Sequence, residues 1–204
     1  MENIHLTYIL PPPVVDGSVS VEKALMNRRS RRRFHGRSIT KEQLSQILWA
    51  AYGFADPYTR LRTAPSAGAT YPLEFYAVVG NVDEIEQGVY KYISAEHKLV
   101  RTLDADVRRE LCHAALGQKM VEDAPLTVVY CAIFERTTNR YGSRGFERYV
   151  CMDVGHSAQN VYLQAEALDL GTCAIGAFMD MKVSQVLQLP GAEEPLYLMP
   201  IGHV

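Results

Sequence analysis

Apolar positions recur at helical spacing in the first quarter of the chain. Leu44, Ile47 and Leu48 follow the segment 40–43, which has the form of a capping box, so a helix is predicted to begin there. Ser20 is a candidate N-cap for a shorter helix that starts at the next residue. Both starts place the polar cap directly before an apolar run.

Beyond this region, strand and helix patterns follow one another. Gly171 is the expected stop of the longest helix, whose apolar residues occupy much of its circumference and indicate burial on more than one side. A short strand or loop is expected over 172–178. The pattern predicts strands over 73–79, 88–93, 126–132 and 196–201, and helices over 105–116, 152–170 and 180–187. Helices that flank a mixed, mainly antiparallel sheet define an α+β fold.

Prolines mark the segments that lie outside this pattern. Residues 11–13 are three consecutive prolines, which fit neither a helix nor a central strand. We therefore expect residues 1–19 to form an extended N-terminal arm and residues 20–204 to form a single domain. Prolines and glycines also interrupt every periodicity over 53–72, which predicts a long loop of the kind that often carries function.

Composition excludes several classes of protein. The 21 basic and 23 acidic residues give a net charge of −2, so non-specific binding of nucleic acid is not expected. A hydrophobic fraction of 48% is sufficient for a packed core. The longest apolar stretches, such as 126–134, are too short to span a bilayer, and the N-terminus lacks the pattern of a secretion signal. No membrane association and a cytoplasmic location are expected.

The cysteines give no sign of a metal centre. Four cysteines are spread along the chain with no C-x-x-C pair, so neither a zinc site nor a disulfide framework is indicated. We expect buried, unreactive thiols and no metal.

The most unusual local composition is a basic cluster. Five of the six residues from Arg28 to Arg33 are arginines, and the sixth is Ser30. Guanidinium groups match phosphate oxygens in pairs, which suggests a phosphate monoester. A solvated basic turn and a nucleic-acid patch are the alternatives.

Two further segments consist mainly of small residues. The ranges 62–72 and 172–178 would let a flat ligand approach the backbone closely, although ordinary turns or a buried strand end have the same composition. No glycine-rich dinucleotide fingerprint and no Walker motif is present. His156 is expected to be a hydrogen-bonded structural residue, and Gln159 and Asn160 are expected to be either structural or ligand-facing.

Taken in order, four segments resemble the FMN-dependent nitroreductase family, and most closely its SagB-type dehydrogenase branch. The similarity extends over about residues 20–204. The segments are Arg28-Arg29-Ser30-x-Arg32-x-Phe34, the run from Pro65 to Glu74, the run from Met152 to Asn160, and the run from Gly171 to Phe178.

The resemblance implies a domain-entwined homodimer with two FMN molecules in the subunit interface. It places the phosphate, ribityl chain or pyrimidine edge of FMN against the basic cluster, the flavin ring against a loop from the partner subunit, and flavin N5 near a backbone N–H. The cofactor-binding residues it implies are Arg28, Arg29, Ser30 and Arg32 for the first contact, Pro65, Ser66, Ala67 and Gly68 for the second, and Ile175, Gly176 and Ala177 for the third.

Three departures from the family pattern change the expectations. Ala69 stands where many nitroreductases have an asparagine that bonds the flavin. The chain ends at Val204, where many relatives continue to a basic phosphate ligand, so more of the phosphate charge is expected to fall on the basic cluster. Relatives that oxidise azolines carry a Lys-Tyr pair where this chain has Arg140-Tyr141, and an arginine that stays protonated cannot act as a base.

The activity implied by the resemblance is hydride transfer from NADH or NADPH through FMN to a small aromatic acceptor such as a nitroaromatic or quinone. The flavin performs the redox chemistry, so no catalytic protein residue is predicted. Tyr141 and Arg144 are candidates for lining the substrate opening, unless their segment is an ordinary surface loop. The alternatives are a non-catalytic protein that binds or senses FMN, and a SagB-type dehydrogenase acting on azolines of a peptide product.

Overall fold

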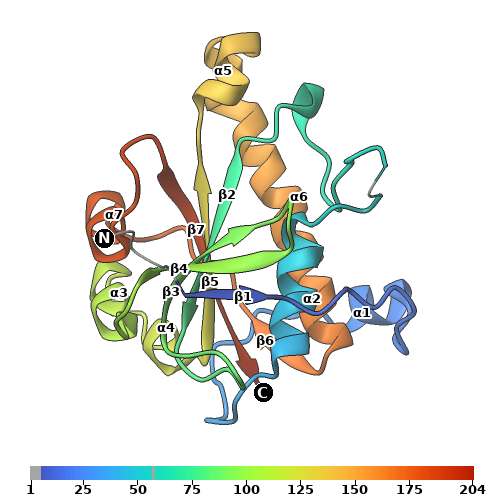
Figure 1. Cartoon of the computed structure of the whole chain (residues 1–204), viewed down its shortest axis with the longest axis vertical. Helices are drawn as coiled ribbons and strands as arrows, with labels where there is room; N and C mark the ends of the chain where they lie inside the picture. Colours follow the sequence, from blue (N-terminus) through green and yellow to red (C-terminus); the bar gives the residue numbers. More distant parts are fainter. Residues whose placement is uncertain (1–5, 57) are drawn as a thin grey trace.

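A seven-stranded sheet forms the centre of the protein (Figure 1). The computed structural model describes residues 6–56 and 58–204. The strand order is β1-β4-β3-β2-β5-β7-β6. The strands are β1 (Thr7–Ile9), β2 (Leu73–Val79), β3 (Gly88–Ile93), β4 (Lys98–Leu103), β5 (Leu126–Ala132), β6 (Leu170–Thr172) and β7 (Glu194–His203).

Neighbouring strands in this sheet are antiparallel. β2 lies in the middle and pairs with β3 on one side and with β5 on the other, in a register that sets Leu73 opposite Ala132 and Val79 opposite Leu126. Parallel pairing in the described residues is limited to isolated bridges, Ser30 with Thr172 and Ile39 with Val82. The expected mixed, mainly antiparallel sheet of an α+β fold is confirmed.

Helices cover both faces of the sheet. α2 (Lys41–Tyr52) and α6 (Val150–Ala167) pack on one face, and α3 (Arg108–Ala114), α4 (Met120–Asp123) and α7 (Asp180–Leu187) cover the other (Figure 1). Successive side chains along each strand point to opposite faces of the sheet, so the sheet has one hydrophobic core on each face. Phe75 packs under α2 and α6, whereas its neighbour Tyr76 faces the α3 and α7 side.

Three elements lie outside these layers. α1 (Val21–Asn27) packs beside one end of α6, while α5 (Glu135–Tyr141) and the π-helical turn η2 (Gly145–Tyr149) lead into the other end. The arm over residues 6–19 is extended, adds β1 to the sheet edge and then crosses α2, where Gln46 bonds both backbone groups of Val14 at 2.9 Å. Residues 1–5 of the predicted arm lie outside the described residues.

Elements with a clear cap or a clear apolar run form where the sequence predicts them. Ser20 accepts from the Lys23 N–H at the start of α1, and Thr40 and Gln43 make the reciprocal capping box of α2. The strands predicted over 73–79, 88–93 and 126–132 are β2, β3 and β5. In contrast, β4, the short strand β1, α4 and α5 form where no element was predicted.

The region after the long helix differs from its prediction. α6 ends before Leu168, the turn is made by Asp169 with φ of 57°, and Gly171 lies inside β6 instead of stopping the helix. Of the short strand or loop expected over 172–178, the structure has the loop, and the strand β6 lies earlier, at 170–172, because it pairs there with the end of β7. α7 runs from Asp180 to Leu187, as predicted, and its N-cap is Met179.

Burial also differs in two places. α6 buries one face, on which Val150, Val154, Val161 and Ala165 lie, so the expected burial on more than one side is wrong for the single chain. Cys112, Cys131 and Cys173 are buried as expected, but Cys151 is exposed. No helix among the described residues is long and apolar enough to cross a membrane.

Candidate functional site

Residues 28–33 form the basic cluster, which we call the basic segment from here on. It follows α1 and lies against the end of β6. Ser30 forms a parallel bridge with Thr172, and the Arg31 N–H donates to the Thr172 carbonyl at 2.9 Å. A little further on, Ile175 pairs with Leu198 of β7 in an antiparallel bridge. The fold therefore brings together the basic segment and the segment 172–178, which are more than a hundred residues apart in the sequence.

Tyr162 of α6 connects these two segments. Its hydroxyl accepts from the Ala174 N–H at 2.8 Å and lies 3.2 Å from Ser30 Oγ. The Arg28 guanidinium lies over the same ring, 5.2 Å from its centroid. One side chain thus fixes the position of the basic segment relative to the strand end.

The basic segment carries positive charge that the described residues do not neutralise. Neither Arg28 nor Arg32 forms an ion pair with any described carboxylate. Arg29 is placed differently, since its Nη1 donates to the carbonyls of Met26 at 3.0 Å and Arg28 at 2.8 Å. Unpaired guanidiniums beside a serine hydroxyl favour an anionic ligand.

Free backbone donors occur in the segment 172–178, whose first residue pairs with the basic segment. Gly176 and Ala177 are exposed, and no described group accepts from their N–H. A side chain at Gly176 would contact only the Tyr197 ring, with the nearest atom at 3.4 Å, so the approach to the backbone is open. Ile175, in contrast, is buried and its N–H donates to the Leu198 carbonyl at 2.9 Å.

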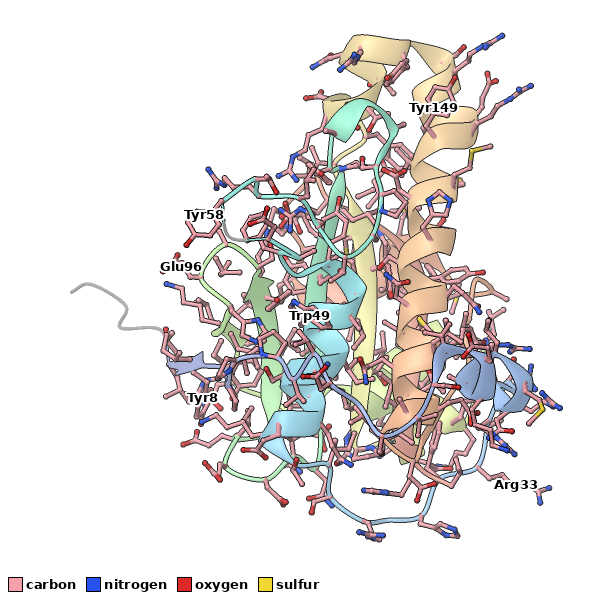
Figure 2. The ribbon with its side chains drawn as sticks, turned by 90° about the vertical axis from the view of Figure 1, so that its right-hand side faces the viewer. Tyr8, Arg33, Trp49, Tyr58, Glu96 and Tyr149 are labelled. Carbon is pink, nitrogen blue, oxygen red and sulfur yellow. The ribbon has the colours of Figure 1, made fainter. Side chains whose placement is uncertain are left out.

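The loop over 65–68 lies at the opposite end of α6. Figure 2 shows α6 along its length, with Tyr149 near one end and Arg33 beyond the other. The loop contacts Asp153 near the start of α6, whereas the basic segment contacts Tyr162, nine residues later and so about 13 Å along the axis. Within one chain the two halves of the predicted site are therefore apart.

Asp153 holds the loop, although no role was predicted for it from the sequence. Its side chain is 2% exposed, accepts from Ser66 Oγ at 2.6 Å and from the Ala67 N–H at 3.3 Å. Ser66 Oγ in turn accepts from the Tyr71 N–H at 2.9 Å. Burial raises the pKa of the Asp153 carboxyl, and these two donors oppose that rise. The sequence signal that could have identified Asp153 is a carboxylate on an otherwise apolar face of the predicted helix.

The loop backbone is tightly constrained. Gly68 has φ of 59°, and a Cβ there would collide with the Tyr141 hydroxyl. Arg140 Nη1 donates to the Gly68 carbonyl at 3.0 Å. Tyr141 therefore lies beside the loop over 65–68, which is predicted to contact the flavin ring and which we call the flavin loop. Arg144 is exposed at the start of η2.

Of the three polar α6 residues considered from the sequence, one is structural and two are exposed. Asn160 donates to the carbonyls of Ala50 at 3.2 Å and Thr63 at 3.1 Å and is structural. His156 and Gln159 are exposed, and His156 bonds no described residue, so the expectation of a hydrogen-bonded structural histidine is wrong. Together with Met152 and Gly155 they form an open stripe along α6, which we call the α6 stripe.

Comparison with known proteins identifies relatives over nearly the whole chain. The pattern of the Nitroreductase family matches residues 25–203. A protein of Methanocaldococcus jannaschii that is named as a nitroreductase is 50% identical over 185 residues, which are 91% of each chain. The NADPH-flavin oxidoreductase of Vibrio harveyi is 33% identical over 52% of this chain. The Escherichia coli microcin B17-processing protein is 26% identical over 72% of it.

Solved structures agree with this relationship. A nitroreductase structure from Anabaena variabilis has a TM-score of 0.87 at 28% identity and covers 98% of this chain. One from Ralstonia eutropha has a TM-score of 0.84 at 27% identity and covers 97%. The chain spans 89% of the R. eutropha chain but only 42% of the A. variabilis chain, and 47% and 55% of the V. harveyi and E. coli proteins. With a family match over most of its length and the nitroreductase fold, the chain belongs to the nitroreductase family.

Proposed function

We propose that the protein is an FMN-dependent oxidoreductase that takes hydride from NADH or NADPH and passes it to a small aromatic acceptor. The observation that carries this proposal is that the basic segment, with Arg28 and Arg32 free of ion pairs, pairs through Ser30 with Thr172, at the start of the segment in which Gly176 and Ala177 have free N–H groups. Family membership and the similarity to a named NADPH-flavin oxidoreductase support it.

The residues present fit FMN. A phosphate monoester requires cations and hydroxyl donors, which Arg28, Arg32 and Ser30 supply without a competing carboxylate. Arg29 already bonds two carbonyls of the α1 end, so we assign it a lesser share of the phosphate charge than the sequence suggested. An uncharged flavin edge requires backbone donors, which are free at Gly176 and Ala177.

When bound, FMN supplies the hydride-accepting atom and the electron transfer itself. The task of the chain is to bind and orient it. Arg28 and Arg32 bind the phosphate, and Ser30 donates to it through a hydroxyl kept in place by Tyr162. The N–H groups of Gly176 and Ala177 would donate hydrogen bonds to the edge of the bound ring.

The loop over 65–68 completes the site only if it comes from a second subunit. The α6 stripe is open along its length, and a Cβ placed on Gly155 would meet nothing within 4 Å, so another helix can approach closely. In a two-fold dimer with antiparallel α6 helices, the start of one α6 lies beside the end of the other. That arrangement would bring Pro65, Ala67 and Gly68 of one subunit to Arg28 of its partner.

Loss of flavin on removal of the cations tests the assignment. The double variant Arg28→Ala and Arg32→Ala is purified beside Arg37→Ala, which removes an exposed arginine outside the site. Each lost charge-assisted bond costs about 1.5 to 3 kcal/mol, so the double variant should lose the yellow flavin spectrum while the control keeps it. Stoichiometric FMN in the double variant would disprove the phosphate assignment.

The same spectrum separates the alternatives. Anaerobic NADPH should bleach the bound flavin of an oxidoreductase, whereas a non-catalytic FMN-binding protein would stay yellow. The azoline alternative has less support, because Arg140 stands where the azoline-oxidising relatives carry a lysine and its Nη1 donates to the Gly68 carbonyl.

A further inference from the structure

A cavity of about 320 Å³ lies in the long loop between α2 and β2, next to the proposed flavin loop. Its walls combine the aromatic rings of Phe54 and Tyr71 with the guanidinium groups of Arg60 and Arg62. Ala69, which directly follows the flavin loop, closes one side. We call it the Arg60–Arg62 cavity.

Arg62 is a cation without an anion among the described residues. Its guanidinium lies over the rings of Tyr52, Phe54 and Tyr71, at 4.3, 4.9 and 5.1 Å from their centroids. Nη1 donates to the Tyr52 carbonyl at 2.7 Å and to Ser94 Oγ at 2.6 Å, while Nε is buried with no partner. Burial lowers the pKa of Arg62, as expected for a partly desolvated charge.

Arg60 adds a second positive charge at the same cavity. It is exposed, lies 5.6 Å from the Phe54 centroid and forms no ion pair with a described residue. The nearest acid in sequence, Asp56, instead accepts from the Tyr58 N–H and from Thr59 Oγ1, both at 2.8 Å. The carboxylate is thus used within its own turn, and the two guanidiniums keep their positive charge.

A smaller cavity of about 130 Å³ lies on the other side of Arg62. Tyr52, 2% exposed, lines it together with Arg62. Buried polar groups are rarely left without a partner, so the unpaired Nε of Arg62, a residue that lines both cavities, indicates that a ligand or water belongs there.

Backbone strain is concentrated around the larger cavity. Arg60, Ala69 and Tyr71 have φ of 57°, 53° and 47°, in the left-handed region that residues other than glycine avoid. Strain of this kind persists mainly at functional sites.

We propose that the Arg60–Arg62 cavity binds the carboxylate of a flat aromatic substrate and so selects anionic acceptors for the proposed reaction. Two aromatic walls accept a planar ring, and two cations without counter-ions accept a carboxylate. The cavity volume is near the lower end for ligand pockets, which suits a single ring. This inference rests on the proposed function, because the ligand is assigned as the electron acceptor.

The test measures binding by titration calorimetry on the purified protein with its bound cofactor, using benzoate and its neutral counterpart benzamide. Benzoate should bind at least about ten-fold more tightly than benzamide, as expected for a charge-assisted hydrogen bond. Arg60→Gln should weaken benzoate binding by a similar factor. The matched control Arg37→Gln, which removes one exposed arginine elsewhere, should change it less than two-fold.

Equal binding of benzoate and benzamide would overturn the proposal, as would equal weakening of benzoate binding by Arg60→Gln and Arg37→Gln. A third contrary outcome is Arg60-dependent binding of adenosine 2′,5′-bisphosphate that is tighter than the binding of benzoate, since it would assign the cavity to the phosphate of NADPH. Flavin content is recorded on the same samples. Charge-selective benzoate binding by a colourless protein would support the cavity and refute the flavin assignment, whereas a bleachable flavoprotein without benzoate selectivity would refute the cavity alone.

Discussion

The Ser66 hydroxyl is the centre of the contacts that hold the proposed flavin loop, and Ser66→Ala tests this. The change leaves Asp153 Oδ2 and the Tyr71 N–H without their partners at 2.6 and 2.9 Å. Loss of a bond to a charged group costs about 1.5 to 3 kcal/mol, and loss of a neutral one costs about 0.5 to 1.5 kcal/mol. We therefore expect the free energy of unfolding to fall by about 2 to 4.5 kcal/mol.

Urea unfolding gives the measurement, with the cofactor content of each sample matched because bound ligand adds stability. Ser143→Ala, an exposed serine with no hydrogen bond to a described residue, is the control and should stay within about 0.5 kcal/mol of the wild type.

A double-mutant cycle with Asp153→Ala then isolates the pair. Its coupling energy should be about 1.5 to 3 kcal/mol. If Ser66→Ala behaved like the control, or if the two substitutions were additive, Asp153 would not hold the loop through Ser66.

Two further predictions concern the arm and the thiols. Burial lowers the pKa of His97, which bonds Ser45, Tyr92 and the Pro11 carbonyl of the arm. A lowered pKa in the folded state means that its contribution to stability is present above about pH 6.5 and is lost as pH falls through the folded value. Urea midpoints should therefore drop more between pH 7 and pH 5 for the wild type than for His97→Gln, and parallel curves would contradict this. A thiol reagent should modify the buried Cys112, Cys131 and Cys173 only on unfolding, as counted by mass spectrometry. Early modification of Cys131 would disagree with the fold.

Local sequence determined the elements whose signals are local. The capping box at Thr40 and the cap at Ser20 start helices because their side chains bond N–H groups three residues away. The apolar runs of β2, β3 and β5 form strands because they are buried within the sheet. The composition of the arginine cluster suggested a phosphate ligand but left a solvated basic turn and a nucleic-acid patch as alternatives.

Tertiary structure decided what depends on residues distant in the sequence. β4 has alternating but weakly apolar residues, and becomes a strand because β3 and β1 pair with it. Gly171 lies in a strand because the end of β7 is available to pair with it. Contacts between segments that the fold brings together set the distance between the basic segment and the loop over 65–68 along α6. They also form the hydrogen bond between Asp153 and Ser66 and place Arg62, without a counter-ion among the described residues, against three aromatic rings. No periodicity encodes these contacts, because each depends on where the whole sheet places its helices and loops.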